Sequence, residues 1–233
     1  MSKALEVTGS YMDIVQTVGR WKVLDVASLE KLCNYKFSYF NLLDKVRKLE
    51  RAGFVKSVFV GRKHKHIFLT DQGIKLTSED CSSEISLENL NHDILTGRFV
   101  QKLLQYEVFK DGKLFHQILD TDVYPDAEVK GVKKDHEYNL AIEIELTQKE
   151  KGRVKNKFVR YKKSPRYDFV LFVMHKESVF RAYNHYLEQM SDEVKQKIIF
   201  LMNPKFERAT WEIEKSICYY LGKEYSFNEF FIS

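Results

Sequence analysis

The sequence predicts a mixed α+β or α/β protein with two domains, and three observations support this. The chain has 233 residues, which is enough for two modest domains. Hydrophobic residues make up 44% of it and charged residues 30%, with only 3 prolines, and this composition is typical of folded globular proteins. Residues 77–86 are polar and rich in Ser and Glu, so we predict a linker there. The domains are expected at residues 1–76 and 87–233.

The cysteines and the apolar stretches bear on where the protein works. Cys33, Cys81 and Cys218 are widely spaced, with no CxxC pair and no Cys/His cluster, so we expect reduced thiols rather than disulfides or a zinc site. The N-terminus carries no apolar signal segment, and the longest apolar runs are only as long as a strand. We therefore expect a cytoplasmic protein with no membrane partner and no small-molecule cofactor.

The first domain reads as three helices followed by a hairpin. Helices are predicted at residues 11–18, at 29–33 with Ser28 as the N-cap, and at 38–52. Strands are predicted at 54–60 and 66–69, joined by a basic turn. The third helix has a stripe of apolar residues at helical spacing, which we expect to be buried: Tyr39, Leu42, Leu43, Val46 and Leu49.

This order of elements is that of a winged helix-turn-helix. Residues 49–55 (LERAGFV), the basic segment 61–65 and residues 69–73 (LTDQG) closely resemble winged-helix regulators of the MarR and PadR kind. The resemblance covers about a third of the chain. It implies binding to double-stranded DNA, with the third helix in the major groove.

Charge is distributed as that function requires. Residues 1–80 hold 14 Lys and Arg against 9 Asp and Glu, whereas residues 81–233 hold 24 of each. Side chains suited to base edges and phosphates lie on the predicted third helix or just before it: Lys36, Ser38, Asn41, Lys45 and Lys48. The turn of the hairpin adds a cationic wing for the minor groove: Arg62, Lys63, His64 and Lys65. A plainer interpretation is a protein-binding module with a solvated charged face.

In the second domain, helices and strands alternate. Helices are predicted at residues 87–105, 151–162 and 178–190. Strands are predicted at 107–109, 115–119, 124–129, 138–146, 169–174 and 198–202. This alternation favours an α/β arrangement around a mixed central sheet.

Acidic residues lie on neighbouring predicted strands of this domain. Glu143 and Glu145 alternate along one strand, so both point to the same face, and Asp126 comes from the strand before it. Three carboxylates form an oxygen-only site suited to Mg²⁺ or Mn²⁺. The Lys-rich helix that follows is expected to hold a phosphodiester backbone, so the sequence predicts metal-dependent DNA cleavage.

The acidic pattern resembles the PD-(D/E)xK nuclease superfamily. By position, Asp126 matches the Asp of that motif and Glu143 its acidic partner, while Glu145 stands where the motif has Lys. The resemblance implies that the following helix supplies the missing cation, either Lys155 or Lys157. It also implies a leading acid, for which Glu88 and Asp93 are the candidates.

The order of motifs along the chain is similar to that of the replication-relaxation family of plasmids and mobile elements. A winged helix is followed by residues 91–93 (NHD), 124–127 (YPDA), 143–145 (EIE), a Lys-rich helix ending at Tyr161, and 169–173 (FVLFV). The resemblance covers most of the chain and implies a role in plasmid or mobile-element DNA replication, mobilisation or processing.

Each motif of the second domain also has a plainer interpretation. Alternating Glu residues are common on the wet face of a sheet, Pro-Asp is a common turn, and a Lys-rich helix is often solvated surface. Two functions therefore stay open: a metal-dependent DNA endonuclease, and a non-catalytic regulator or replication accessory factor whose second domain dimerises or binds DNA. Because many winged-helix proteins dimerise, we expect a homodimer.

Overall fold

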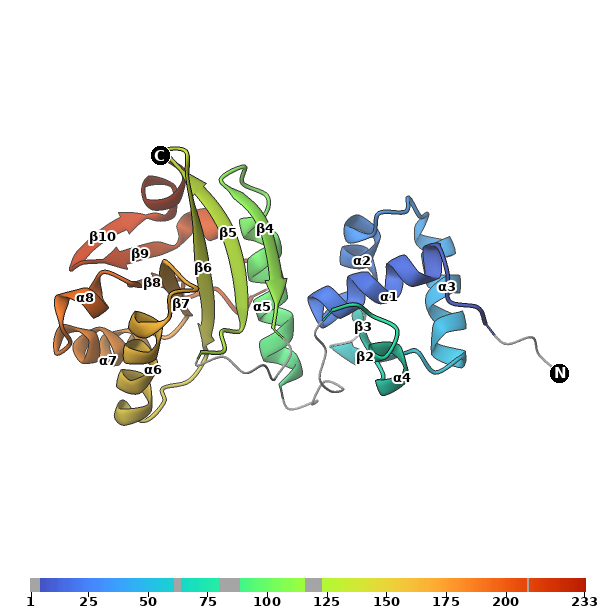
Figure 1. Cartoon of the computed structure of the whole chain (residues 1–233), viewed down its shortest axis with the longest axis horizontal. Coiled ribbons are helices and arrows are strands. Elements are labelled where there is room, and N and C mark those ends of the chain that lie inside the picture. Colours follow the sequence, from blue (N-terminus) through green and yellow to red (C-terminus); the bar gives the residue numbers. More distant parts are fainter. Residues whose placement is uncertain (1–4, 61–63, 80–88, 116–122, 209) are drawn as a thin grey trace. The chain divides into compact units, whose positions relative to one another are not determined.

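Figure 1 shows the computed structural model, which describes residues 5–60, 64–79, 89–115, 123–208 and 210–233. The chain divides into two compact units. Unit 1 comprises Met1–Gly97 with Leu114–Leu119, and unit 2 comprises Arg98–Lys113 with Asp120–Ser233. The helix α5 (Leu90–Leu103) therefore contributes residues to both units.

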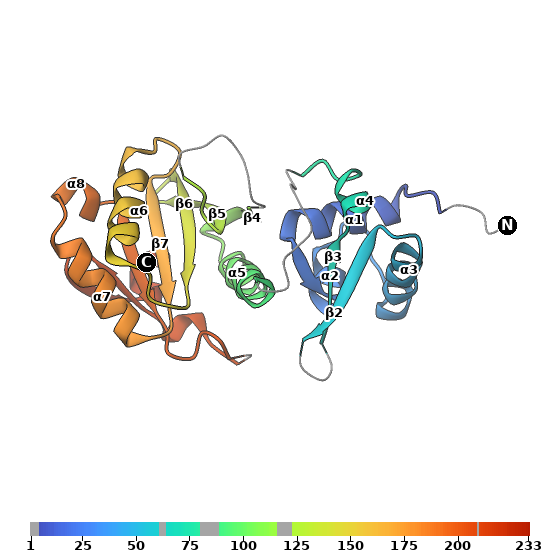
Figure 2. The same cartoon turned by 90° about the horizontal axis from the view of Figure 1, so that it is seen from below.

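Unit 1 contains four helices and a three-stranded antiparallel sheet among its described residues up to Ile74. The elements are α1 (Ser10–Trp21), β1 (Val23–Asp25), α2 (Val26–Leu32), α3 (Tyr39–Arg51), β2 (Val55–Val60), β3 (His64–Leu69) and α4 (Asp71–Ile74). The strand order is β1-β3-β2, so the short strand before α2 pairs with the second strand of the hairpin. Figure 2 shows α3 beside this hairpin.

Side-chain caps define where the helices of unit 1 begin. Asp25 caps α2 by accepting a hydrogen bond of 2.7 Å from the backbone N–H of Ser28, so the predicted cap at Ser28 is wrong. The helix starts earlier because the Asp25 carboxylate is in position to accept that N–H. Ser38 caps α3 in an extended conformation, with its Oγ accepting from the N–H of Asn41 at 3.4 Å. Ser38 therefore precedes the helix rather than lying on its surface.

The buried stripe of α3 is narrower than predicted. Leu42, Val46 and Leu49 are fully buried, but Leu43 is only half-buried and Tyr39 is 44% exposed. Tyr39 is the first residue of the helix, and its ring packs edge-on against the exposed ring of Phe40 at 5.9 Å instead of entering the core.

Unit 2 is built around a seven-stranded mixed sheet. Besides the second part of α5, its elements are β4 (Phe109–Leu114), β5 (Ala127–Lys133), β6 (His136–Glu145), α6 (Lys151–Lys163), β7 (Phe169–Met174), α7 (Glu177–Glu188), α8 (Asp192–Lys195), β8 (Ile198–Met202), η1 (Ile213–Lys215), β9 (Ile217–Tyr220), β10 (Lys223–Ser226) and η2 (Asn228–Ile232). The strand order is β10-β9-β8-β7-β6-β5-β4. Strands β6, β7 and β8 are parallel, and β5 and β9 flank them in antiparallel pairing. The predicted mixed sheet is confirmed.

Two predicted strands begin later than expected. The strand expected at 107–109 is replaced by β4, which begins at Phe109, whereas the strand expected at 115–119 lies, apart from Phe115, outside the described part of the chain. The strand expected at 124–129 begins only at Ala127, because Asp126 directs its carboxylate to the backbone of β6 before the strand starts.

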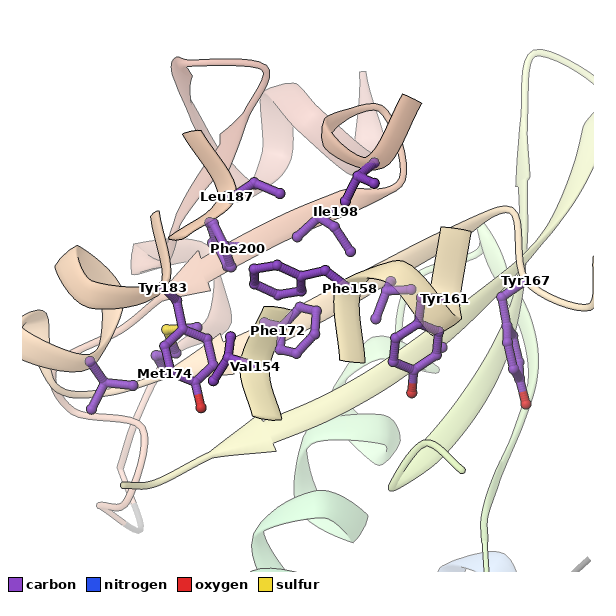
Figure 3. Close-up of a cluster of buried hydrophobic side chains, with 14 of the residues drawn as sticks. Val154, Phe158, Tyr161, Tyr167, Phe172, Met174, Tyr183, Leu187, Ile198 and Phe200 are labelled. Carbon is purple, nitrogen blue, oxygen red and sulfur yellow. The ribbon is translucent and has the colours of Figure 1, made fainter. Parts of the chain in front are cut away.

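Helices cover both faces of this sheet. Figure 2 shows α6 and α7 on one side of β6 and β7, with α5 on the other side. The core beneath α6 and α7 is rich in aromatic residues, and Phe158 of α6 packs edge-on against Phe172 of β7 with the ring centroids 5.2 Å apart. Figure 3 shows this cluster together with Tyr161 and Tyr183.

None of the helices in the described residues is long and apolar enough to cross a membrane.

Gly73 of α4 lies against the main chain of Phe54, and this close approach predicts a large effect of one methyl group. A Cβ atom at Gly73 would lie 2.0 Å from the carbonyl oxygen of Phe54, which is a backbone atom that a rotamer change cannot move. We expect Gly73→Ala to lower the free energy of unfolding by about 2 kcal/mol. The measurement is urea-induced unfolding followed by tryptophan fluorescence, since Trp21 and Trp211 are both buried.

The matched control is Gly152→Ala in the first turn of α6. A Cβ there meets only the flexible carboxylate of Glu150, at 3.0 Å, so Ala should be neutral or slightly stabilising. Equal stability of the two variants would contradict the close approach at Gly73.

Candidate functional site

Two carboxylates of β6 lie in the buried layer between the sheet and α6. Glu143 and Glu145 are each only 3% exposed. They alternate with Ile142 and Ile144 and share their face with Ala141, which belongs to the core beneath α6 and α7. The interpretation of these residues as the wet face of a sheet is therefore wrong. Buried carboxylates need partners, because desolvation of a charged group is costly.

Lys157 of α6 supplies a cation to both carboxylates. Its Nζ lies 2.8 Å from Oε2 of Glu143 and 3.1 Å from Oε1 of Glu145. The side chain is 29% exposed, so its stem is buried while the ammonium bridges the two acids close to solvent. A single lysine therefore satisfies one oxygen of each acid.

Tyr161 lies one helical turn after Lys157 and donates its hydroxyl to Oε1 of Glu143. The spacing of four residues puts both side chains on the same face of α6. Burial, and then the nearby charge of Glu143, raise the pKa of Tyr161 well above its ordinary value of 10.0. The hydroxyl therefore stays protonated, and remains a donor to Glu143, at physiological pH.

Asp126 joins this group from the residue before β5. Its Oδ2 accepts a hydrogen bond of 2.7 Å from the N–H of Ile144, and its own N–H donates to the carbonyl of Ile142 at 2.9 Å. These two bonds hold Asp126 beside Glu143. Burial, and then the charge of Asp126, raise the pKa of Glu143 to about 7, although Lys157 and Tyr161 act in the opposite direction.

Tyr183 of α7 lies near Glu145. It is completely buried, and its hydroxyl has no hydrogen-bond partner among the described residues. Burial, and then the charge of Glu145, raise the pKa of this tyrosine above its ordinary value. Figure 3 shows the hydroxyls of Tyr161 and Tyr183 pointing the same way, out of the phenylalanine cluster. We call Asp126, Glu143, Glu145, Lys157 and Tyr161 the acidic site.

The structure distinguishes the two lysines suggested by the sequence. Lys157 binds both acids, whereas Lys155 directs its Nζ to Oε1 of Gln189 at 2.7 Å, near the end of α7. Of the two candidates for a leading acid, Glu88 lies outside the described residues and Asp93 forms an ion pair of 3.2 Å with Lys22 in unit 1. Tyr161 was not assigned to the site from sequence, although its spacing from Lys157 could have indicated it.

The three acids of the acidic site offer only carboxylate oxygens as metal ligands, and a hard divalent cation such as Mg²⁺ prefers oxygen ligands. In the described residues, however, no three Asp, Glu, His or Cys side chains are grouped to hold a metal ion. The ammonium of Lys157 lies between Glu143 and Glu145, and the Oδ2 atom of Asp126 is engaged with the backbone of β6. Metal binding by these three acids therefore requires Lys157 to move away from at least one of them.

The candidate DNA-contacting residues of α3 differ in their exposure. Lys36, Asn41 and Lys48 are exposed. Lys48 forms an ion pair of 2.7 Å with Asp44 on the helix surface. Lys45 is half-buried, with its Nζ 4.3 Å from the centre of the Tyr11 ring. Lys45 therefore lies at the edge of the solvent-exposed face of α3 and not at its centre.

Arg47 and Arg51 are exposed on this face, although neither was predicted from the sequence to contact DNA. They share a line along the helix with Phe40 and Asp44, opposite the buried stripe. The segment from residue 36 to residue 65 contains nine Lys and Arg residues but only two acids, Asp44 and Glu50. No acid lies in the first turn of α3.

The wing residues are described only in part. Arg62 and Lys63 lie outside the described residues, and His64 is exposed at the start of β3. Lys65 is half-buried and turns back toward α3, where its Nζ lies 2.7 Å from Oε2 of Glu50. Lys65 therefore anchors the hairpin to α3 in this structure.

Comparison with known proteins finds no match to this chain among family models, curated proteins or solved structures. The resemblances to winged-helix regulators, to the PD-(D/E)xK superfamily and to the replication-relaxation family therefore stay predictions.

The raised pKa of Glu143 predicts a characteristic dependence of stability on pH. The folded state holds the proton of this group up to a pH of about 7, whereas an ordinary glutamate loses it near 4.5. The contribution of Glu143 to stability therefore falls as the pH rises through this window, and Gln, which cannot ionise, escapes this loss. We expect the free energy of unfolding of Glu143→Gln, relative to that of the wild type, to rise by about 2 kcal/mol as the pH is raised from 5 to 8.

Urea unfolding at four pH values across this range measures the effect. Glu137→Gln is the matched control, because Glu137 is exposed on the same strand. A difference between Glu143→Gln and the wild type that does not change with pH would refute the assignment of a raised pKa to Glu143.

Proposed function

We propose that unit 1 is a winged helix-turn-helix that binds double-stranded DNA. The observation that carries this proposal is the exposed cationic surface of α3 beside the β2–β3 hairpin, in a segment with nine Lys and Arg residues and two acids. The order α1-β1-α2-α3-β2-β3 and the strand order β1-β3-β2 support it, since a winged helix combines three helices with such a sheet.

In this proposal α3 enters the major groove and its exposed residues make the contacts. Asn41 is suited to an adenine edge, and Arg47 and Lys48 to guanine or to phosphates. The ion pair of Lys48 with Asp44 is weak, because both side chains are about half exposed, so Lys48 can exchange its partner for a phosphate. Residues of the wing, including His64, add contacts to the backbone or the minor groove.

Neutralising two cations of α3 tests this proposal. We expect the double variant Arg47→Gln/Lys48→Gln to lose about ten-fold in affinity for duplex DNA, and to reduce the slope of log affinity against log salt by about 2. Fluorescence anisotropy with a labelled duplex at several salt concentrations measures both quantities.

The control changes the same net charge elsewhere. Lys75→Gln/Lys223→Gln replaces two exposed lysines outside α3 and the hairpin. Equal losses in both double variants would point to nonspecific attraction to the whole chain and would contradict a role for α3.

We also propose a second function, metal-dependent cleavage of DNA by unit 2. The observation that favours it is the grouping of Asp126, Glu143 and Glu145 with Lys157 in the acidic site. The order α5-β4-β5-β6-α6-β7, with a β5–β6 antiparallel pair followed by a parallel strand, is consistent with the PD-(D/E)xK resemblance. Asp126, Glu143 and Glu145 would hold Mg²⁺ or Mn²⁺, which activates water for attack on a phosphodiester.

Lys157 and Tyr161 would then have different roles in the reaction. Lys157, which bridges Glu143 and Glu145, would take the part of the Lys of the superfamily motif and contact the attacked phosphate or orient the nucleophile. Tyr161 holds Glu143 in place through its hydroxyl. On the replication-relaxation resemblance, the role would be plasmid or mobile-element DNA replication, mobilisation or processing. A non-catalytic accessory role for unit 2 is the alternative that the following test separates, and a homodimer is compatible with either role.

Nicking of supercoiled plasmid with Mg²⁺ or Mn²⁺, together with calorimetric titration of each ion, tests the second function. We expect the wild type to bind the ion and nick the plasmid, and Asp126→Asn and Glu145→Gln to lose both properties while duplex binding by unit 1 persists. Glu137→Gln should behave like the wild type, because Glu137 is exposed near the start of β6, six residues before Glu143.

Absence of ion binding and nicking in all four proteins, with duplex binding intact, would leave unit 2 as a non-catalytic domain. Nicking that survives in Asp126→Asn and Glu145→Gln would mean that the acidic site does not carry it.

A further inference from the structure

Four aromatic side chains surround the start of α3 and are largely exposed. We call Tyr35, Phe37, Tyr39 and Phe40 the aromatic patch. Phe40 is 81% exposed, Tyr35 51% and Tyr39 44%, and Phe37 is half-buried. A single exposed ring needs no explanation, but four aromatic residues within a segment of six, three of them exposed, are typical of an interaction site.

The backbone that carries these rings is held in place from inside unit 1. Asp13 of α1 is buried, and its carboxylate accepts hydrogen bonds from Nδ2 of Asn34 at 2.8 Å and from the N–H of Tyr35 at 3.0 Å. The cap at Ser38 fixes the next residues. The rings also pair with one another, Tyr35 with Phe37 at 6.2 Å and Tyr39 with Phe40 at 5.9 Å. The patch is therefore presented on an ordered loop and helix end.

The charges around the patch favour a polyanionic partner. Lys36 lies within it and is exposed, and no acid lies in the first turn of α3. Asp44, one turn after Phe40, is paired with Lys48, and Arg47 follows it along the same line of the helix. A second copy of this chain would bring two cationic surfaces together, which costs free energy. Exposed rings among cations are more typical of nucleic-acid binding sites, where the rings stack on nucleobases and the cations contact phosphates.

Unpaired bases fit these rings better than a closed duplex does. A duplex offers base edges in its grooves, and one ring against a thymine methyl group would suffice there. The flat faces of bases become accessible only where the bases are unstacked. We infer that the aromatic patch stacks on unpaired nucleobases at the junction of duplex and single-stranded DNA, with Phe40 as its main ring. This inference rests on the proposed duplex binding by unit 1 and names the kind of DNA that unit 1 prefers.

The test compares three labelled DNAs with the full-length protein by fluorescence anisotropy: a blunt duplex, the same duplex with a single-stranded tail, and the tail alone. We expect the tailed duplex to bind about ten-fold more tightly than the blunt duplex. Phe40→Ala should abolish this preference, so that tailed and blunt duplexes bind equally, and Phe40→Trp should retain it. A 2-aminopurine base in the tail next to the duplex should be quenched by the wild type but not by Phe40→Ala.

Leu221→Ala is the matched control, because Leu221 is 51% exposed in unit 2, outside the patch. This variant should keep the preference for the tail. If the wild type binds blunt and tailed duplexes equally, or if Phe40→Ala weakens both alike, the inference is overturned while duplex binding stands. If no duplex binds at all, the proposed function of unit 1 fails with it.

Discussion

The burial of Glu143 and Glu145 on one face of β6 is the constraint on which unit 2 depends. Each charged group loses several kcal/mol of hydration free energy when it is buried, so two buried carboxylates need hydrogen bonds or a nearby cation to offset this loss. Lys157 and Tyr161 both come from α6, and together they fix that helix over β6 in one position. Phe158, between them in sequence, adds apolar contact with Phe172, but the ionic contacts specify the register. The acidic site and the packing of this layer are therefore the same structural feature.

One ammonium does not neutralise this site. Lys157 faces Glu143 and Glu145, and Asp126 adds a third carboxylate nearby, so the group stays acidic unless it gains a proton or another cation. Burial, and then the charge of Asp126, raise the pKa of Glu143, so protonation near neutral pH can remove one of these charges. A divalent cation would offset them as well. Glu145 stands where the PD-(D/E)xK motif has Lys, and in this chain a cation reaches the two acids from the following helix, as Lys157.

Much of this architecture could be predicted from sequence, and the failures have local causes. The alternation of apolar and acidic residues identified β6 and put Glu143 and Glu145 on one face, but it could not show that α6 buries that face. The choice between Lys155 and Lys157 depends on helical phase: Val154, Phe158 and Tyr161 mark the buried side of α6, and Lys157 is close to it whereas Lys155 is not. The cap of α2 is Asp25 and not Ser28. Both residue types can cap a helix, so the sequence alone did not show at which of the two residues the helix begins.

The two units differ in how their charged side chains are paired, and this difference affects what each unit can bind. In unit 2 the acids meet a lysine of the same unit, so a ligand must displace or complement an existing ion pair. In unit 1 the two acids near α3 are already engaged, Glu50 by Lys65 and Asp44 by Lys48, and they are outnumbered by cations at the surface. That excess finds its counter-charge in solvent ions or in a polyanion. Release of those ions contributes much of the affinity of proteins for nucleic acid, and this contribution is the electrostatic basis of the DNA binding proposed for unit 1.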